Sequence, residues 1–411
     1  MSTSFYDALE ARDPAEREAA LMVALPAQIA HAQASSPAYT ELLAGVDAAA
    51  ITSRAALATL PLTRKSNLAA AQAARRALRL GGFAAGMPRR IFQSPGPLYE
   101  PEPDVDGADP WRVARALHAA GIRAGQLAHV SFSYHLTPAG AMMEAGLRAL
   151  GAASFPGGIG NTELQLQAVL DLQPEAYAGT PSFLRILLEK AADAGQPLPW
   201  LQRALVSGEA CPPALVAWFA ERGVAAFQCY ATADLGLIAY ETAARDGLVV
   251  DEGVIVEIVR PGSGEPLPEG EVGEVVVTTL SPGYPLIRFA TGDLSAVLPG
   301  NCPTGRSNQR LRGWLGRADQ SAKVRGMFVH AGQVADIVKR HPEVRRARLV
   351  VSGELAQDHV VLQVEMCEPT PTGLVESLMQ TARDVTKLRI LIDLLPPGSL
   401  PNDGKLIEDR R

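Results

Sequence analysis

Hydrophobic positions follow two alternating patterns over most of this chain. Apolar residues recur at helical spacing over residues 5–45 and 111–120, and a further helix is predicted from residue 133 through Met142 and Leu147. Short apolar runs such as residues 126–132 lie between these stretches and are typical of buried strands. Strands that alternate with helices predict a doubly wound α/β sheet, with ligands at the carboxyl ends of the strands.

The pattern changes in the second half of the chain. Residues 249–280 are rich in β-formers, which predicts a small antiparallel barrel or distorted sheet. A strand over residues 284–289 follows, and Thr291-Gly292-Asp293 is predicted to end it in a tight turn. Asp293 could accept hydroxyl hydrogen bonds from a ribose, and the alternative is an aspartate that bonds its own backbone in that turn.

The apolar segments after Asp319 have the order of a small α+β, ferredoxin-like lid. We therefore predict a large N-terminal domain over residues 1–318, which combines doubly wound sheets with the barrel-like part. Residues 319–411 are predicted to form the C-terminal lid domain.

Composition fits an ordinary globular protein. With 411 residues, of which 47% are hydrophobic and 20% charged, the chain can bury a large core. The acidic N-terminus lacks a basic segment followed by an apolar one, so no secretory signal is expected. The apolar run over residues 19–30 contains Pro26 and is shorter than the roughly 20 residues that cross a bilayer, so no membrane association is expected.

The net charge bears on possible binding partners, and the cysteines bear on the cellular compartment. The net charge of -6 and the pI near 5.7 argue against a nucleic-acid partner, because such domains usually carry a concentrated basic face. The cysteines are widely spaced and form no C-x-x-C pair, which favours a reducing cytoplasm; they are Cys211, Cys229, Cys302 and Cys367. The oligomeric state is left open, with a homodimer as one candidate.

Residues 91–111 are unusual because they are rich in both prolines and acidic residues. A loop that cradles phosphate presents several backbone N–H groups on flexible glycines, and proline has no N–H to offer. The residues concerned are Pro95, Pro97, Pro101, Pro103, Glu100, Glu102, Asp104 and Asp106. One interpretation is a stiff, polyproline-like surface loop. The other is a remodelled site that holds phosphates through Mg²⁺ or binds a different ligand.

Several motifs occur in an order that resembles a known family. Thr291-Gly292-Asp293, then residues 314–320 (WLGRADQ) and 323–326 (KVRG), resemble the nucleotide and hinge motifs of adenylate-forming enzymes. Within that superfamily the chain most resembles the phenylacetate-CoA ligase family. Residues 60–65 (LPLTRK) resemble its Leu-Pro-x-Thr-x-Lys segment, although a proline-led helix start capped by Thr63 is the alternative.

The resemblance implies an ATP-dependent acyl- or aryl-CoA ligase. Such an enzyme activates a small-molecule carboxylic acid as its adenylate, after which coenzyme A displaces AMP, so ATP, Mg²⁺ and coenzyme A are the implied cofactors. The alternative is an altered homologue of the same fold. It would bind acyl groups or nucleotides, or would act as a transferase on a preformed acyl-adenylate or acyl thioester.

The resemblance also implies the roles of individual residues in nucleotide binding. Ser207, Gly208 and Glu209 match the adenine-contacting segment, and Tyr230 matches the tyrosine that stacks on adenine. Asp234 matches an acid that holds Mg²⁺, and Asp293 and Arg317 would anchor the ribose. The hydroxyl expected at the α-phosphate falls at Ala233, while Thr232 lies one residue earlier and would point elsewhere on an extended backbone.

The remaining matches concern the acyl group and the lid. Tyr134, His135 and Gly140 fall where the family forms its acyl pocket, and a neutral core histidine that caps a helix is the alternative for His135. Asp319 matches the hinge, and Lys405 matches the lysine that contacts the acyl-phosphate, with an ordinary solvated lysine as the alternative. Thr304 replaces the second cysteine of the family's Cys-Pro-Cys knuckle, so no metal is assigned there.

Overall fold

The structure is a computed structural model of the chain. It describes residues 5–94, 98–103, 109–260, 263–318, 321–324, 327–353, 358–366, 373–401 and 405–411. The chain divides into two compact units. The first comprises Met1–Gly208, Val216–Thr291 and Ser295–Trp314, and the second comprises Glu209–Leu215, Gly292–Leu294 and Leu315–Arg411.

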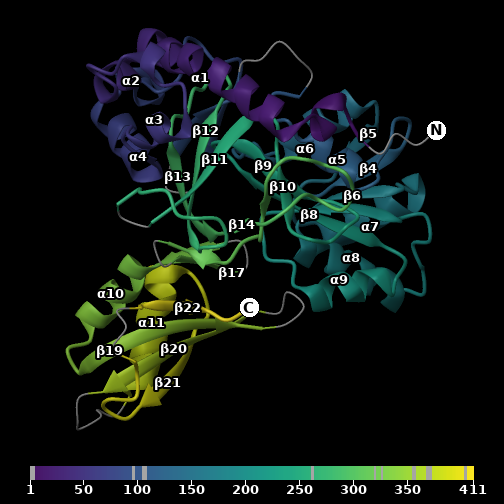
Figure 1. The fold of residues 1–411 in the computed structure, drawn as a ribbon. Coiled ribbons are helices and arrows are strands. Elements are labelled where there is room, and N and C mark those ends of the chain that lie inside the picture. Colours follow the sequence, from purple (N-terminus) through teal and green to yellow (C-terminus); the bar gives the residue numbers. More distant parts are fainter. Residues whose placement is uncertain are drawn as a thin grey trace. The chain divides into compact units, whose positions relative to one another are not determined.

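The first unit begins with a group of helices, as the spacing over residues 5–45 predicts (Figure 1). Each of the first two α-helices begins with proline, and Asp13 and Ser36 cap their first turns by accepting backbone hydrogen bonds. The group consists of η1 (Ala8–Ala11), α1 (Pro14–Ser35), α2 (Pro37–Leu42), η2 (Ala48–Ala50), α3 (Arg54–Ala58), α4 (Lys65–Ala74) and η3 (Arg79–Gly82).

Thr63 does not cap α4, contrary to the alternative considered from the sequence. Thr63 lies in strand β1 (Thr63–Arg64), and its hydroxyl donates to the Ile287 carbonyl at 2.9 Å. The N-cap of α4 is Arg64, whose backbone N–H donates to Asn67. The polar atoms of Thr63 are therefore used to join two strands.

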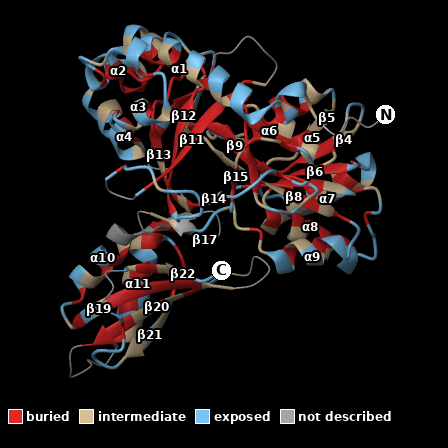
Figure 2. Ribbon diagram, viewed as in Figure 1, coloured by how far each residue is buried: buried red, intermediate tan, exposed pale blue. Residues whose placement is uncertain are grey.

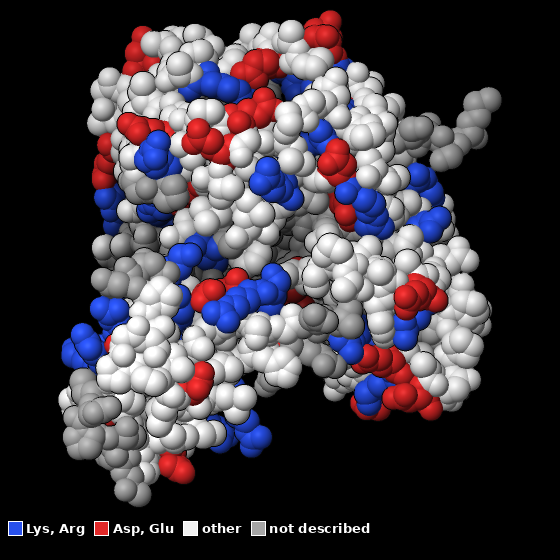
Figure 3. Space-filling model, turned by 60° about the horizontal axis from the view of Figure 1, so that its bottom comes forward, with Lys and Arg blue, Asp and Glu red and all other residues white. Residues whose placement is uncertain are grey.

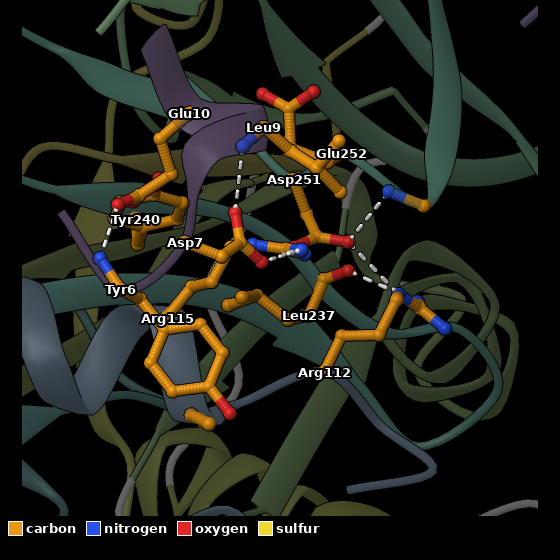
Figure 4. Close-up of polar contacts among 12 residues, drawn as sticks. Tyr6, Asp7, Leu9, Glu10, Arg112, Arg115, Leu237, Tyr240, Asp251 and Glu252 are labelled. Atoms are coloured by element: carbon orange, nitrogen blue, oxygen red, sulfur yellow. Dashed lines mark hydrogen bonds and ion pairs between the residues drawn. The ribbon is translucent and has the colours of Figure 1, made fainter. Parts of the chain in front are cut away.

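The segment before α1 is anchored to the first unit by buried charges (Figure 4). The Glu10 carboxylate accepts from the Tyr240 hydroxyl and from Arg306 Nε. Arg115 donates to both Asp7 and the fully buried Asp251. Each of these buried carboxylates has a guanidinium partner, as burial of charge requires.

A nine-stranded sheet forms the larger layer of the first unit. Its order is β14 (Val297–Leu298), β15 (Arg310–Leu311), β10 (Leu248–Val250), β9 (Gly236–Glu241), β8 (Ala225–Thr232), β7 (Arg203–Val206), β6 (Ala176–Gly179), β4 (Leu127–Val130) and β5 (Ala153–Pro156). The strands β8, β7, β6, β4 and β5 are parallel, and the others are antiparallel.

Helices connect the parallel strands, which confirms the predicted doubly wound α/β arrangement (Figure 1). They are α6 (Ala139–Leu150), α7 (Thr162–Leu172), α8 (Pro181–Asp193) and α9 (Pro213–Ala220), and α5 (Ala114–Ala119) precedes the first parallel strand, β4. None of the helices in the described part of the chain has the length and apolar character needed to span a bilayer.

A second sheet follows the order β1, β13 (Phe289–Ser295), β12 (Gly273–Thr279) and β11 (Val254–Val259), and β16 (Gly316–Arg317) pairs with β13. The predicted strand over residues 284–289 and the turn at residues 291–293 are both wrong. The strand begins at Phe289, and Thr291-Gly292-Asp293 lies inside it.

Arg288 precedes β13 with a φ of 45°, which is unusual for a residue with a side chain. Its guanidinium donates to the Glu257 carboxylate at 3.1 Å and to three backbone carbonyls. Arg288 and Glu257 are both buried. This set of bonds offsets a left-handed backbone that costs about 1–2 kcal/mol.

Residues 91–94 and 98–101 form two paired antiparallel strands, so the polyproline-like surface loop is wrong for the described part of this segment. Strands β2 (Ile91–Ser94) and β3 (Leu98–Pro101) pair antiparallel, with Ser94 opposite Leu98. Leu98 and Glu100 point inward and are buried. Glu102 pairs with Arg90, which lowers the pKa of that carboxyl. Pro95, Pro97, Asp104 and Asp106 lie outside the described residues.

The second unit contains a small α+β domain, as the fold class predicted, and its bounds of residues 319–411 stay a prediction. Its main sheet has the order β21 (Leu391–Leu395), β20 (His359–Met366), β19 (Val344–Ser352) and β22 (Ile407–Asp409). The hairpin β17 (Ser321–Val324) and β18 (Met327–His330) precedes α10 (Ala331–Arg340), and α11 (Leu374–Thr386) follows β20. Leu349, Leu362 and Leu378 are fully buried in its core.

Within each unit, buried residues run along the strands, while the exposed residues lie mainly on helices and loops (Figure 2). On the face drawn in Figure 3, basic and acidic side chains are interspersed. The absence of a nucleic-acid partner stays a prediction.

Candidate functional site

Three groups of predicted site residues lie at the carboxyl ends of parallel strands of one sheet, in which β6 separates β4 from β7. Tyr134 follows β4, Ser207 follows β7, and Tyr230 lies near the end of β8. In an open α/β sheet this edge is where ligands bind.

Tyr134 packs against Gly140, whereas His135 does not take part in this contact. A Cβ placed on Gly140 would come within 2.8 Å of the Tyr134 ring, so only glycine permits this packing. The Tyr134 hydroxyl is buried, with no hydrogen-bond partner among the described residues, and burial raises its pKa. His135 is exposed, so a buried core histidine is wrong.

The predicted adenine segment lies in the turn after β7. The Ser207 hydroxyl donates to the Cys229 carbonyl at 2.8 Å, which ties this turn to β8. Gly208 has a φ of 82°, a conformation that favours glycine, and it is exposed. Glu209 is half-buried and belongs to the second unit.

The turn between β8 and β9 carries the next two predicted residues. Thr232 uses its hydroxyl to accept from the Leu235 backbone N–H at 3.1 Å, so this side chain supports the turn. Asp234 is 5% exposed. Tyr230 is half-buried and packs against the core.

Asp234 belongs to a buried cluster of charges that the motifs did not predict. Lys65 Nζ lies 3.3 Å from Asp234 Oδ2, 3.4 Å from Glu100 Oε1 and 3.0 Å from Ser94 Oγ. Ser94 Oγ also donates to Glu100 Oε1 at 2.8 Å. Burial and then the Asp234 carboxylate raise the pKa of Glu100 well above its usual range.

The cluster does not fit the Mg²⁺ ion that the sequence placed at Asp234. Mg²⁺ needs oxygen ligands at about 2.0–2.1 Å in an octahedral arrangement. One Asp234 oxygen already faces an ammonium group. Among the described residues, no group of three or more His, Cys, Asp or Glu side chains could hold a metal ion.

Asp293 and Arg317 meet within the second unit. They are paired in register across β13 and β16, and Arg317 Nη1 donates to Asp293 Oδ1 at 3.1 Å. A side chain on Gly292 would come within 2.7 Å of Arg317 Nη2. Asp293 is 9% exposed, so its carboxylate has a defined orientation.

Lys405 is exposed at the end of a loop that is held from within the second unit. The buried Arg348 donates to the carbonyl oxygens of Lys405 and Pro401, and Glu365 accepts from the Gly398 and Leu400 N–H groups. Arg348 therefore supports this loop. Asp319, the predicted hinge, lies outside the described residues.

The sequence of residues 134–284 matches the family described as AMP-binding enzyme. The phenylacetate-coenzyme A ligase of Thermus thermophilus is 30% identical over 92% of this chain and 92% of its own length. The chain belongs to the phenylacetate-coenzyme A ligase family. The phenylacetate-coenzyme A ligase of Aromatoleum evansii is also 30% identical, over 82% of this chain and 79% of that protein.

The fold of this family member agrees with solved structures. A crystal structure of 2-hydroxyisobutyryl-CoA ligase, in complex with 2-HIB-AMP and CoA, superposes with a TM-score of 0.80 over 99% of this chain and 92% of that one, at 22% identity. The predicted family, fold and ligase class are therefore confirmed.

The sequence analysis did not predict that Lys65, Ser94 and Glu100 come together beside Asp234. The sequence analysis matches residues 60–65 to the family and names Glu100 only as one of the acidic residues of segment 91–111. Their convergence was not predicted, because Lys65 lies 35 residues from Glu100 and 169 from Asp234. One feature of the sequence could have indicated the cluster: Glu100 is an acidic residue close to apolar residues such as Leu98, and an acid in such a position needs a positive partner if it is buried.

Proposed function

We propose that this chain is an ATP-dependent ligase that joins a small acyl or aryl carboxylic acid to coenzyme A through an acyl-adenylate. The observation that supports it most is the 30% identity to a phenylacetate-coenzyme A ligase over 92% of the chain. The residues at the carboxyl ends of β4, β7 and β8 are of the kinds this reaction needs.

In the first half-reaction a carboxylate oxygen attacks the α-phosphorus of ATP and pyrophosphate leaves. Tyr134 and Gly140 shape the pocket for the acid, with His135 at its exposed edge. Ser207, Gly208, Glu209 and Tyr230 bind the adenine, and Thr232 supports their turn. Asp293 and Arg317 hold the ribose hydroxyls. When bound with ATP, Mg²⁺ would neutralise phosphate charge.

Lys405 carries a fixed positive charge on the lid. At the α-phosphate it would stabilise the charge that develops in the transition state, which is the kind of electrostatic contribution that most lowers such barriers. In the second half-reaction the thiol of coenzyme A attacks the acyl carbonyl, and the bond to the AMP oxygen breaks. Asp319 would be the hinge that lets the lid of residues 319–411 serve both steps.

A second function is favoured by the β2–β3 hairpin. Three N–H groups in and next to these strands are engaged: Gln93 donates to Leu136, Tyr99 to Gln72 and Glu102 to Arg90. These groups are unavailable to cradle a triphosphate. The second candidate is therefore a transferase or binding protein that takes a preformed acyl-adenylate or acyl thioester.

We also infer a cytoplasmic protein, because the three described cysteines are buried free thiols. A homodimer remains a prediction.

Exchange of labelled pyrophosphate into ATP tests the ligase. The purified protein is incubated with ATP, Mg²⁺ and a panel of aryl and fatty acids. Acid-dependent exchange, followed by AMP release when coenzyme A is added, is expected. If no acid supports exchange but synthetic acyl-AMP is converted to a thioester, the transferase is correct instead.

A further inference from the structure

The cluster around Lys65 has the geometry of a small cation site in which the cation is the Lys65 ammonium: the two acids are buried, while the Lys65 side chain is 43% exposed. Three elements that are distant in sequence meet there: the first residue of α4, the hairpin β2–β3 and the turn after β8. Each supplies one charged side chain, and Ser94 adds a hydroxyl.

The donors and acceptors at this ammonium match in number. A lysine ammonium has three N–H donors, and three oxygens lie within 3.4 Å of Nζ. Both acidic residues are nearly inaccessible, with Glu100 at 0% and Asp234 at 5% exposure. A buried carboxylate needs a positive partner, and Lys65 is the one that faces both acids.

Acceptor atoms remain around the same point. Glu100 Oε2, Asp234 Oδ1 and the Tyr284 hydroxyl are buried, and among the described residues they have no protein partner beyond the side-chain hydrogen bond between the Glu100 and Asp234 carboxyls. The negative charges of Asp234 and Glu100 act on Tyr284, which places all three groups in one neighbourhood. The cluster therefore has more oxygen atoms than its single ammonium can satisfy.

We propose that Lys65 is the built-in counterion of Asp234 and occupies the place that a divalent cation would take there. The ammonium lies between the oxygens that would have to close around a metal, so both cannot be present. The positive charge of the Lys65 ammonium would also repel a divalent cation that approached Asp234. Any Mg²⁺ needed for the reaction then arrives bound to the nucleotide, and Asp234 is not its ligand.

Removal of the ammonium should convert the cluster into a metal site. Lys65→Ala leaves the Asp234 carboxylate beside the Glu100 carboxyl, whose raised pKa favours its protonated form. An ion bound there would displace that proton, because ligands must be deprotonated, and oxygen ligands are the kind that Mg²⁺ and Mn²⁺ prefer. Lys65→Met is a second variant that keeps the apolar stem and loses only the charged end. Both are assayed for folding by near-ultraviolet circular dichroism.

Mn²⁺ without nucleotide is the probe, and its electron paramagnetic resonance signal falls when the ion is bound. We expect the wild-type protein to leave Mn²⁺ free at this site, so that Asp234→Asn changes nothing. Lys65→Ala and Lys65→Met should bind Mn²⁺ tighter by about tenfold or more, since affinity rises with the number of charged ligands. Adding Asp234→Asn to either variant should abolish that gain.

Lys190→Ala is the matched control. Its side chain has the same 43% exposure as that of Lys65, but it pairs with Glu163 on the surface. It should bind no additional Mn²⁺. Wild-type binding that Asp234→Asn removes would overturn the proposal. So would the lack of any gain in folded Lys65 variants. Because the assay needs neither ATP nor an acid, its outcome is independent of the ligase reaction.

Discussion

Asp293 and Arg317 are paired across β13 and β16, with 3.1 Å between the carboxylate and the guanidinium. The carboxylate is 12% exposed and the guanidinium side chain 20%, so the pair is partly shielded from water. A charge held in this way needs little rearrangement when a ribose arrives, which lowers the entropic cost of binding.

Asp293→Ala should weaken AMP binding by about 1–3 kcal/mol, the cost of leaving polar groups of the ligand unmatched. Isothermal titration calorimetry with AMP measures the loss. Asp293→Asn keeps an acceptor oxygen and should lose less. Equal AMP affinity in all three proteins would mean that Asp293 serves only the strand pairing.

Lys405→Ala should separate the two half-reactions. Acyl-adenylate formation should fall by about 10²–10³-fold, the range for loss of one preorganised charge-stabilising donor. Thioester formation from synthetic acyl-AMP should persist. Arg348 bonds the backbone oxygen of Lys405, so the loop keeps that bond after the substitution.

Pyrophosphate exchange and thioester formation are measured in the Lys405→Ala protein, with Arg348→Met as a comparison that loosens the loop itself. Arg348→Met is expected to lower both rates. If Lys405→Ala behaved in the same way, Lys405 would act through the structure of the lid.

Gly140→Ala should alter recognition of the acid. The new methyl group would lie 2.8 Å from the Tyr134 ring, so the ring has to move. We expect the KM for the acid to rise by about tenfold, within the 1–3 kcal/mol cost of forcing extra volume into a packed site. The KM for ATP should change little.

Tyr134→Phe is the control for Gly140→Ala. It keeps the ring and removes a buried hydroxyl for which the described residues supply no partner. Its thermal stability should match or exceed that of the wild type. A KM for the acid that is unaffected by Gly140→Ala would place the acyl pocket elsewhere.

Glu100 should make stability depend on pH. Burial, followed by the nearby Asp234 carboxylate, raises its pKa from 4.5 to about 9. Between these values the folded protein keeps a proton that the unfolded chain has released, so stability falls as pH rises across this window. Glu100→Gln lacks the titrating group, and its decline should be shallower.

The midpoint of urea unfolding, followed from about pH 5 to about pH 9, measures this difference. Lys65, Asp234 and Tyr284 face Glu100 in both proteins. Glu102→Gln, on the same hairpin, is the control, because Arg90 lowers the pKa of Glu102 and that contribution is lost only as pH falls below the usual range. Parallel curves for wild type and Glu100→Gln would contradict the prediction.

The main sheets of this chain could be predicted because their strands are short runs of apolar residues, which are typical of strands buried on both faces of a sheet. The hairpin β2–β3 could not, because its prolines are typical of non-strand segments. A two-stranded ribbon has only edge strands, and Pro101 can sit opposite Ile91 without breaking a central ladder. Gly292 misled in the same way: a glycine after a predicted strand suggested a turn, but it lies inside β13 with a φ of 76° and makes room for Arg317.

The site was predictable where one local motif carries the chemistry. Tyr134 with Gly140, and Ser207 beside β8, lie at strand ends that the fold class itself specifies. The surroundings of Asp234 were not predictable, because Lys65 reaches it from 169 residues away. The charged partners of a buried acid are set by tertiary contacts between distant segments, so a local sequence pattern cannot predict them.

The anchoring of the segment before α1 has a practical consequence for anyone who shortens this chain. Removing residues 1–10 would take away Glu10 and leave Arg306 and the Tyr240 hydroxyl without the carboxylate they bond in the interior. Such losses in buried sites are typically worth about 3–5 kcal/mol. Affinity tags are therefore better extended from Met1 than substituted for these residues, and a protease that trims beyond Glu10 would be expected to yield a less stable product.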